Sequence, residues 1–326
     1  MRALVTGSTG FVGNALVRRL LADEGQVVVA GVRDSRSRPP SGVERLCLAS
    51  LGASADWRAG LHGVDTVYHL AARVHVMRDT ATDPLTAFRT VNVEGTVELA
   101  RQCVATGVRR FVYVSSIKVN GERTLPGRPF RADDVPEPGD PYGVSKHEAE
   151  QALHRLAGES GLELVIVRPT LVYGPGVRAN FLRMMDWLWR GIPLPFGAVT
   201  NQRSLVALDN LIDLLRVCAR HPLAPGNTFL VGDGHDLSTA ELLSELGRAL
   251  GRPARLIPVP PALMDLGFRM LGKPDLAQRL FGSLQVDIGK TRSLLGWTPL
   301  VGVTHALQQT AADFLARQRV VGARST

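Results

Sequence analysis

The chain has 326 residues, enough for two modest domains or for one large domain with an added lobe. Its formal net charge is +8, but the arginines are dispersed and no aromatic residues alternate with them. This pattern argues against a nucleic-acid partner and favours an anionic small substrate. No apolar run approaches the ~20 residues that span a bilayer, and the first residues do not form a signal peptide. The sequence therefore predicts a cytoplasmic protein without a membrane partner.

Short apolar runs alternate with amphipathic segments through the first half of the chain. They predict strands at residues 2–6, 26–32, 65–70, 109–114 and 163–168, and helices at 11–21, 85–106 and 142–158. The stretch 35–63 is polar and has no regular pattern. Such alternation predicts an α/β fold of the Rossmann type, with a doubly wound parallel sheet whose ligands bind at the carboxyl ends of the strands.

The alternation loosens in the second half of the chain, where helical patterns at 178–190, 209–219, 238–250 and 302–318 are separated by proline-rich joints. We expect residues 1–175 to form a dinucleotide-binding domain to which residues 204–235 return. Residues 176–203 and 236–326 are expected to form a smaller, mostly helical substrate-binding lobe. The three cysteines, Cys47, Cys103 and Cys218, are far apart, and they predict neither a disulfide framework nor a metal site.

A glycine-rich turn follows the first predicted strand directly, in the order Gly7-Ser8-Thr9-Gly10-Phe11-Val12-Gly13. Glycines allow the backbone to turn sharply and to approach a pyrophosphate, which then meets the free N–H groups of the following helix. The candidate cofactor-binding residues of this turn are Gly7, Thr9, Gly10, Phe11, Val12 and Gly13.

The end of the second predicted strand bears on the choice of dinucleotide. An acidic residue there binds the ribose of NAD, but this chain has Gly31 and Val32, followed by Arg33. An arginine can hold the additional phosphate of NADP, so Arg33 favours NADP. Asp34 keeps NAD open as the alternative.

A tyrosine and a lysine four residues apart, Tyr142 and Lys146, begin the helix predicted after the fourth strand and lie on one face of it. An ammonium group together with an oxidised nicotinamide favours the phenolate and so lowers the pKa of the tyrosine. Ser116 follows the fourth predicted strand, where its hydroxyl would bond a substrate oxygen whose proton Tyr142 moves. These three residues are the predicted catalytic group.

The chain resembles the extended short-chain dehydrogenase/reductases, the NAD-dependent epimerase/dehydratase group that acts on nucleotide sugars. The motifs of the resemblance are residues 6–13, His69-Leu70-Ala71-Ala72, Asn92-Val93-Glu94-Gly95-Thr96, Val114-Ser115-Ser116, Tyr142 with Lys146, and Arg168-Pro169 followed by Val172-Tyr173-Gly174-Pro175. The resemblance implies that Ser116, Tyr142 and Lys146 are catalytic, and that Leu70, Ala71, Ala72, Arg168 and Pro169 join Tyr142 and Lys146 around the cofactor. It also implies a structural or water-holding role for Asn92.

The candidate substrate contacts are spread over distant parts of the chain. By the resemblance, Asn180 and Arg203 would contact the diphosphate or the uracil of a UDP-linked sugar. Arg73 and His75 follow the third predicted strand, and Arg279 is one of several arginines in the C-terminal lobe that suit a phosphorylated substrate. His69, on a buried strand, is expected to be a core residue.

Two departures from the family pattern guide the choice of reaction. Family dehydratases carry an Asp–Glu pair after the catalytic hydroxyl residue, whereas this chain has Ile117-Lys118, so dehydration is not expected. The absence of an acid at Gly31 or Val32 favours exchangeable NADPH. The first hypothesis is therefore a 4-reductase of UDP-4-keto-6-deoxy-N-acetylhexosamines in surface-polysaccharide synthesis.

The main alternative is a UDP-hexose 4-epimerase acting on UDP-glucose or UDP-N-acetylglucosamine. A reductase of a non-nucleotide ketone and a non-catalytic NADP-binding protein are further alternatives. The resemblance also implies a homodimer, formed through the helices expected at residues 85–106 and 142–158.

Overall fold

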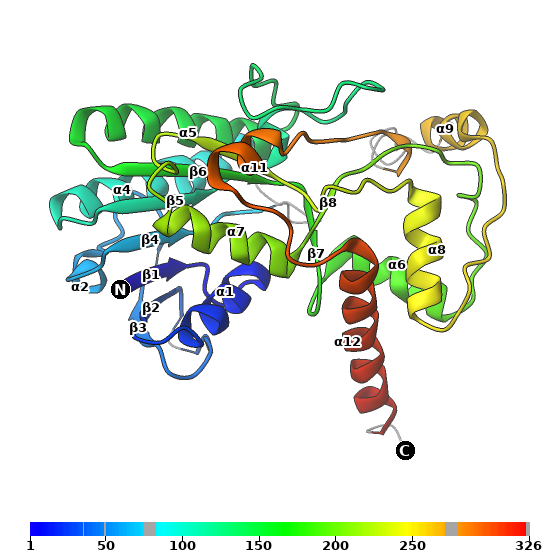
Figure 1. The fold of residues 1–326 in the computed structure, drawn as a ribbon, viewed down its shortest axis with the longest axis horizontal. Coiled ribbons are helices and arrows are strands. Elements are labelled where there is room, and N and C mark those ends of the chain that lie inside the picture. The colour runs from blue at the N-terminus through cyan, green and yellow to red at the C-terminus, as the bar shows by residue number, and fades with distance from the viewer. Residues whose placement is uncertain (35, 49, 75–82, 271–279, 324–326) are drawn as a thin grey trace.

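The computed structural model describes residues 1–34, 36–48, 50–74, 83–270 and 280–323. A seven-stranded parallel sheet has the order β3-β2-β1-β4-β5-β6-β9 (Figure 1). The strands are β1 (Arg2–Thr6), β2 (Val27–Val32), β3 (Glu44–Cys47), β4 (Thr66–His69), β5 (Arg110–Val114), β6 (Glu163–Pro169) and β9 (Thr228–Val231). The strand order reverses between β1 and β4, which is where ligands of doubly wound sheets bind. The predicted Rossmann-type fold is confirmed.

Helices cover both faces of the sheet, as central strands with consecutive buried residues require (Figure 1). Ala3 and Val5 of β1 pack into one core with α1 (Phe11–Leu21) and α7 (Leu208–Arg220). Leu4, between them, packs into a second core with α4 (Gly95–Ala105) and α5 (Pro141–Ser160). Cys103 and Cys218 lie one in each core and are fully buried, as expected of small apolar side chains.

The helix expected at residues 85–106 is confirmed in extent, since residues 84–105 are helical throughout, but it is not a regular α-helix. Helix α3 (Pro84–Arg89) is followed by a π-helical turn, Thr90–Glu94, and only then by α4. Gly95 lies so close to Leu51 that a Cβ there would stand 1.6 Å from the main-chain oxygen of Leu51. Periodicity cannot reveal such a contact between distant segments, nor the widened turn that accompanies it.

The polar stretch at residues 35–63 is more regular than its sequence suggests. It contains β3, whose register pairs Val29 with Glu44 and Val32 with Cys47, and the short helix α2 (Arg58–Leu61). The neighbouring β2 is buried, so its main-chain groups need a partner strand even though β3 itself is mostly exposed. The prediction also missed β9 and a separate parallel pair, β7 (Leu171–Tyr173) with β8 (Leu205–Ala207).

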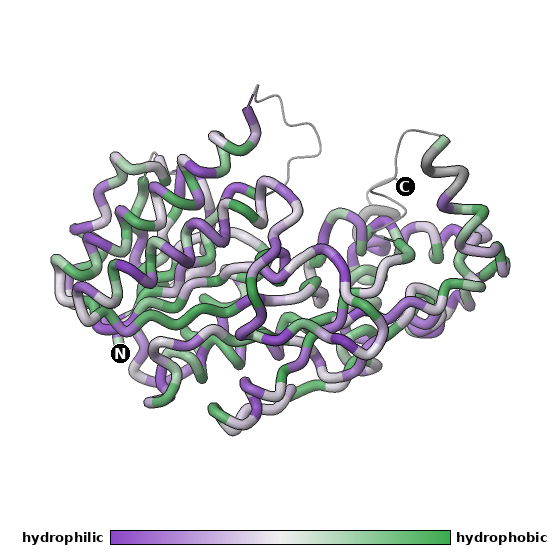
Figure 2. The backbone as a smooth tube through the Cα atoms, turned by 90° about the horizontal axis from the view of Figure 1, so that it is seen from above, coloured by the Kyte–Doolittle hydropathy of each residue, from purple (hydrophilic) through white to green (hydrophobic). Residues whose placement is uncertain are grey.

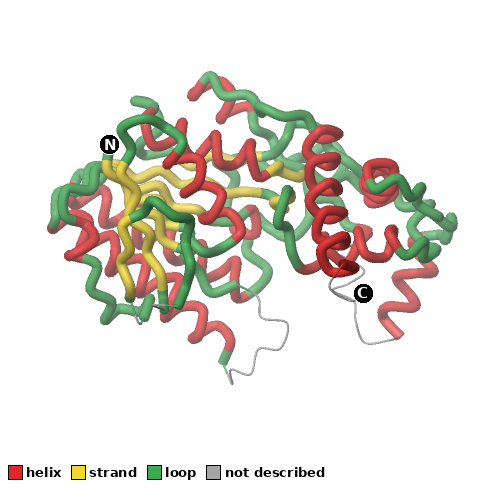
Figure 3. Tube along the Cα trace, turned by 90° about the horizontal axis from the view of Figure 1, so that it is seen from below, coloured by secondary structure: helices red, strands yellow, loops and turns green. Residues whose placement is uncertain are grey.

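A second body, built mainly of helices, lies beside the sheet domain (Figures 2 and 3). Its core joins α6 (Ala179–Trp189), α8 (Thr239–Ala249), α9 (Pro261–Met270) and α12 (Val303–Ala323). Strand β8 connects the two bodies, because Val206 packs in the sheet core while Leu205 and Ala207 pack in the helical core. Helix α11 (Gly289–Leu295) returns to the sheet through Leu295. None of the helices in the described part of the chain is long and apolar enough to cross a bilayer.

Candidate active site

The glycine turn has the geometry of a phosphate-binding loop. Gly7 has a φ of +67°, and the Gly10 amide donates to the Gly7 oxygen at 2.9 Å. A Cβ on Gly13 would stand 2.1 Å from the Gly7 oxygen, so only glycine lets α1 begin this close to β1. No side chain caps α1, and the first N–H groups of a helix have no intrahelical acceptor. These residues therefore fit the pyrophosphate of a dinucleotide.

The main chain after β4 is held by Thr6. Its hydroxyl oxygen accepts from the amides of Leu70, at 3.1 Å, and Ala71, at 3.0 Å, so its own hydrogen is directed to His69 Nδ1 at 2.8 Å. His69 Nε2 then donates to Thr96 Oγ1 at 2.8 Å. Burial, assisted by Lys146, lowers the pKa of His69 to about 3. His69 is thus a neutral core residue, as the sequence predicted.

Asn92, in the π-helical turn, joins the segment after β4 to the helix of the predicted catalytic residues. Its Oδ1 accepts from the Arg73 amide at 2.8 Å, and its Nδ2 donates to the Arg73 oxygen at 3.1 Å and to Ser145 Oγ at 3.0 Å. These bonds support the structural one of the two roles that the resemblance implied for Asn92. The Arg73 guanidinium lies 5.8 Å from the centre of the Phe88 ring, which itself lies edge-on to Tyr142.

The three predicted catalytic residues come together at the carboxyl end of β5. Ser116 follows this strand and caps a short turn, Ile117–Val119, by accepting from the Lys118 amide. Tyr142 lies in the first turn of α5, which Asp140 caps by accepting from the Gly143 amide at 2.7 Å. Lys146, one turn further, donates from Nζ to the Val114 oxygen at 2.9 Å. A helix start therefore faces a strand end in the region where this fold binds ligands.

Burial controls the charges of this site. It raises the pKa of Tyr142, with Asp140 adding to the effect, and it lowers the pKa of Lys146 to about 7 against the opposing influence of Glu150. In the protein by itself, desolvation therefore outweighs the attraction between the ammonium and a phenolate. Lowering the pKa of Tyr142 needs a further positive charge beside the ring, as the sequence analysis assumed.

Lys118, in the turn that Ser116 caps, forms ion pairs with two carboxylates that local sequence patterns do not predict. Its ammonium donates to Asp140 Oδ2, and to Glu122 Oε1 at 3.1 Å. These two carboxylates neutralise a lysine close to the site, so neither is placed as an independent acid or base.

Arg168, expected beside the cofactor, has its guanidinium inside the protein. It donates to Glu150 Oε1 at 2.9 Å, to Glu150 Oε2 at 2.5 Å and to Asn120 Oδ1 at 2.9 Å. Both members of the ion pair are almost fully buried. A contact between Arg168 and a cofactor is therefore left to its main chain. Pro169 ends β6 opposite Val231.

The end of β2 differs from the usual dinucleotide site in a way that the sequence did not reveal. A Cβ on Gly31 would stand 3.2 Å from the fully buried side chain of Trp57, and the Gly31 oxygen accepts from Ser8 Oγ at 2.9 Å. Arg33 is exposed, whereas Asp34 forms an ion pair with Arg36 at 3.3 Å. Trp57 thus lies against Gly31, one of the two positions where an acid would bind the ribose of NAD.

The structure describes only some of the residues that were predicted to contact the substrate. Arg203 donates to the Gly282 oxygen at 3.0 Å, and its main chain bridges to Leu237 and Leu284, so it joins three segments of the chain. Asn180 is exposed in the first turn of α6. His75 and Arg279 lie outside the described residues. Within those residues, no group of three or more His, Cys, Asp or Glu side chains is arranged to hold a metal ion.

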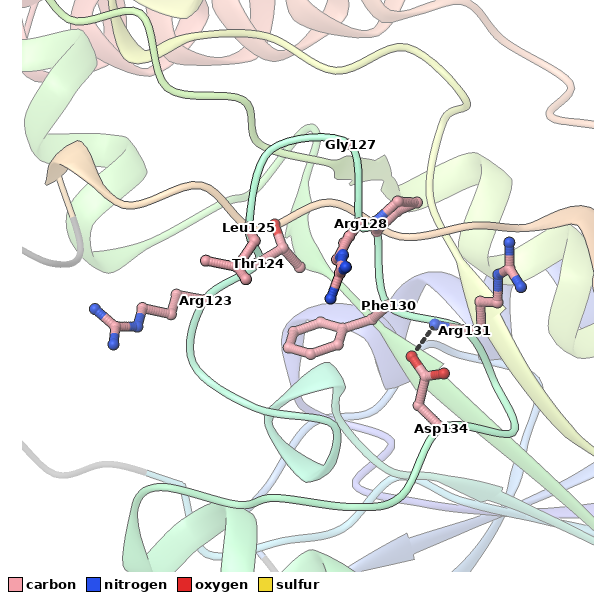
Figure 4. A pocket seen from close by; sticks show the side chains of 9 residues that line it. Arg123, Thr124, Leu125, Gly127, Arg128, Phe130, Arg131 and Asp134 are labelled. Atoms are coloured by element: carbon pink, nitrogen blue, oxygen red, sulfur yellow. Dashed lines mark hydrogen bonds between the residues drawn. The ribbon is translucent and has the colours of Figure 1, made fainter.

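A basic pocket of about 470 Å³ lies on the loop that joins Ser116 to Tyr142 (Figure 4). Its loop is attached to the rest of the chain by the Thr124 amide, which donates to Ser283 O, and by the Phe130 amide, which donates to Gln285 O, each at 2.9 Å. The lining residues are Arg123, Thr124, Leu125, Gly127, Arg128, Pro129, Phe130, Arg131 and Asp134.

The fold and the site together define a dinucleotide-dependent enzyme of the extended short-chain dehydrogenase/reductase class. The profile of the NAD dependent epimerase/dehydratase family matches residues 3–232. The chain belongs to that family.

Named relatives agree with this assignment. The UDP-glucose 4-epimerase of Vibrio cholerae is 48% identical over 313 residues, which cover 96% of this chain and 95% of the relative. The UDP-glucose 4-epimerase of Mycolicibacterium smegmatis is 32% identical over 330 residues, covering 96% and 98%. Among solved structures, MoeE5 in complex with UDP-glucose and NAD superposes with a TM-score of 0.77 at 27% identity, over 98% of this chain and 100% of the other.

Proposed function

We propose that the protein is a UDP-hexose 4-epimerase that uses NAD, and that it interconverts the two configurations at carbon 4 of a UDP-linked glucose-type sugar. The observation that carries the proposal is the 48% identity to a UDP-glucose 4-epimerase over nearly the whole of both chains. The 4-reductase, the first hypothesis from the sequence, has less support than this alternative, because both curated relatives named above are epimerases.

The arrangement of the chain's own residues suits this reaction. NAD, bound at the glycine turn, supplies the hydride acceptor and the positive charge that the buried phenol of Tyr142 needs. Tyr142 takes the proton of the carbon-4 hydroxyl and returns it once the opposite face of the sugar is presented. The ammonium of Lys146 stabilises the phenolate form of Tyr142. The hydroxyl of Ser116 bonds the same substrate oxygen.

NAD, and not NADP, is proposed because the matching family is described as NAD dependent and because MoeE5 binds NAD. The expectation of NADP rested on Arg33 and has no support among these relatives. An epimerase is also expected to keep its dinucleotide bound throughout the reaction, because the hydride removed from the sugar must be returned to the same sugar.

The distribution of charge supports a substrate with a diphosphate. Residues 176–203 and 236–326, the proposed substrate lobe, contain fifteen lysines and arginines against eight aspartates and glutamates. Nearly the whole of the +8 excess therefore lies in the part of the chain that would receive the nucleotide. Arginine guanidinium groups bind phosphate oxygens in pairs, which a neutral ketone would not require.

The test begins with purified protein and no added cofactor. Denaturation should release NAD in an amount close to one per chain, identified by mass, and UDP-glucose should then be converted to UDP-galactose by the native protein. UDP-N-acetylglucosamine, assayed in parallel, defines the group accepted at carbon 2. Release of no dinucleotide, together with oxidation of NADPH only when a UDP-4-keto sugar is present, would overturn the proposal in favour of the reductase.

A further inference from the structure

Glu150 lies one helical turn beyond Lys146 on α5, and its carboxylate is held entirely inside the protein. Its exposed fraction is 3% and that of Arg168, its partner, is 5%. Arg168 bonds both carboxylate oxygens, and residues four apart on a helix lie on the same face. The carboxylate is therefore fixed on the side of α5 that carries Tyr142 and Lys146.

The side chain of Lys146 is also buried, at 2% exposure. A buried ammonium loses its hydration, and a nearby negative charge compensates for that loss. Lys146 Nζ bonds the Val114 oxygen and lies 4.5 Å from the centre of the Tyr113 ring on β5. On its own helix it faces Tyr142 and Glu150, and from β4 it faces His69, which is neutral at ordinary pH because burial lowers its pKa to about 3. Burial lowers the pKa of Lys146 as well, and Glu150 is the charged neighbour that opposes this effect.

We propose that Glu150, held by Arg168, is a positioning residue that keeps the Lys146 side chain in its charged form against the end of β5. Arg168 donates to both oxygens of the carboxylate, so that a buried acid stays ionised. The effect on the reaction rests on the proposed function. The effect on the charge of Lys146 is a property of the folded chain and can be measured separately.

The same ion pair also reaches the turn of Ser116. Arg168 donates to Asn120 Oδ1, and Asn120 Nδ2 donates to the Arg131 oxygen at 2.8 Å. Asn120 ends the Ile117–Val119 turn that Ser116 begins. One buried pair thus connects the helix of Tyr142 and Lys146 with the turn that carries Ser116.

Direct observation of the lysine side chains tests the proposal. The chain has only four lysines, Lys118, Lys146, Lys273 and Lys290, so protein made with isotope-labelled lysine gives four side-chain signals by NMR. The signal lost in Lys146→Arg belongs to Lys146. In the native protein this signal should titrate near neutral pH, and in Glu150→Gln its midpoint should move down by about one pH unit.

Glu148→Gln is the matched control. Glu148 lies on the same helix and is also bound by an arginine, since Arg89 Nη2 donates to its Oε1 at 2.5 Å, but this pair is on the partly exposed side. Loss of its charge should leave the Lys146 titration where it is.

A second variant protects the test against misfolding. Removing one member of a buried pair strands the other charge, whereas Glu150→Gln combined with Arg168→Gln replaces the pair by two neutral amides of similar shape. The Lys146 midpoint should move down in this double variant too. If the midpoint stays at its native pH in both Glu150 variants, Glu150 does not hold the charge of Lys146 and the proposal is wrong.

The kinetic consequence is measured on the holoenzyme with UDP-glucose. The pH at which kcat falls on the alkaline side should move down in Glu150→Gln and stay unchanged in Glu148→Gln, with a smaller effect on KM. If no epimerase activity is found while the Lys146 titration shifts, the proposed function is wrong and the role of Glu150 stands.

Discussion

Lys146 Nζ donates to the main-chain oxygen of Val114 at 2.9 Å, across a separation of 32 residues in the chain. This bond attaches the first turns of α5 to the carboxyl end of β5. Ser116 follows Val114 by two residues and Tyr142 precedes Lys146 by one helical turn, so the bond joins the two segments that carry the three predicted catalytic residues.

Tyr142→Phe should lower kcat by about 10²–10⁴-fold, the usual contribution of a positioned acid or base, with little change in stability. A UDP-glucose epimerase assay together with thermal unfolding measures both. Tyr113→Phe is the matched control. Within the described part of the chain no group bonds its buried hydroxyl, and its ring would remain beneath Lys146. An unchanged kcat in Tyr142→Phe would show that its hydroxyl takes no part in the reaction, and equal losses in the two variants would show that the loss is not specific to Tyr142.

Gly13→Ala should abolish retention of a dinucleotide and destabilise the fold. The added Cβ would stand 2.1 Å from the Gly7 oxygen, which forces α1 away from the turn. The measurements are the dinucleotide content of the purified protein and its unfolding free energy in urea. As a control, Gly158→Ala places a Cβ in open space near the end of α5 and should stabilise the protein by about 0.5–1 kcal/mol. Normal dinucleotide content in Gly13→Ala would contradict the geometry of the turn.

The protein should lose stability as the pH falls below about 6.5, because His69 is neutral and fully buried in the folded chain. Its pKa is about 3 when folded and near 6.5 when unfolded, so between these values only the unfolded state binds the proton. The contribution is complete above pH 6.5 and decreases by about 1.4 kcal/mol per pH unit toward pH 3. Free energies of unfolding in urea at pH 7 and pH 5.5 measure this decrease, because most carboxylates stay ionised between these two pH values. His69→Gln should remove this part of the slope, and an unchanged slope would exclude His69 as its source.

Asn92→Ala should destabilise the protein by about 1–3 kcal/mol, since it leaves both main-chain groups of Arg73 without their side-chain partner. The segment after β4 is then no longer fastened to α5, so KM for UDP-glucose is expected to rise as well. Asn227→Ala removes two bonds to main-chain oxygens in an exposed loop and should cost less than about 1 kcal/mol. Unfolding in urea and steady-state kinetics provide the comparison, and similar losses in the two variants would count against a special role for Asn92.

The sequence by itself determined the parts of the site that depend on residues close together in the chain. The glycine turn is defined by seven consecutive residues, and Tyr142 and Lys146 are placed by a spacing of one helical turn. The apolar runs also predicted the central strands to within a residue or two, because a strand buried on both faces needs a continuous apolar segment.

Only the tertiary structure decided how distant residues meet. The partner of Arg168 is Glu150, 18 residues away, and the space beside Gly31 is filled by Trp57. Strand β3 is mostly exposed and forms because β2 needs a hydrogen-bonded neighbour, and the helix at residues 85–106 widens into a π-helical turn just before Gly95 meets Leu51. Local periodicity does not predict these contacts, because each one forms between two segments that are far apart in sequence. Such segments must match in volume, charge and hydrogen bonding where they pack together.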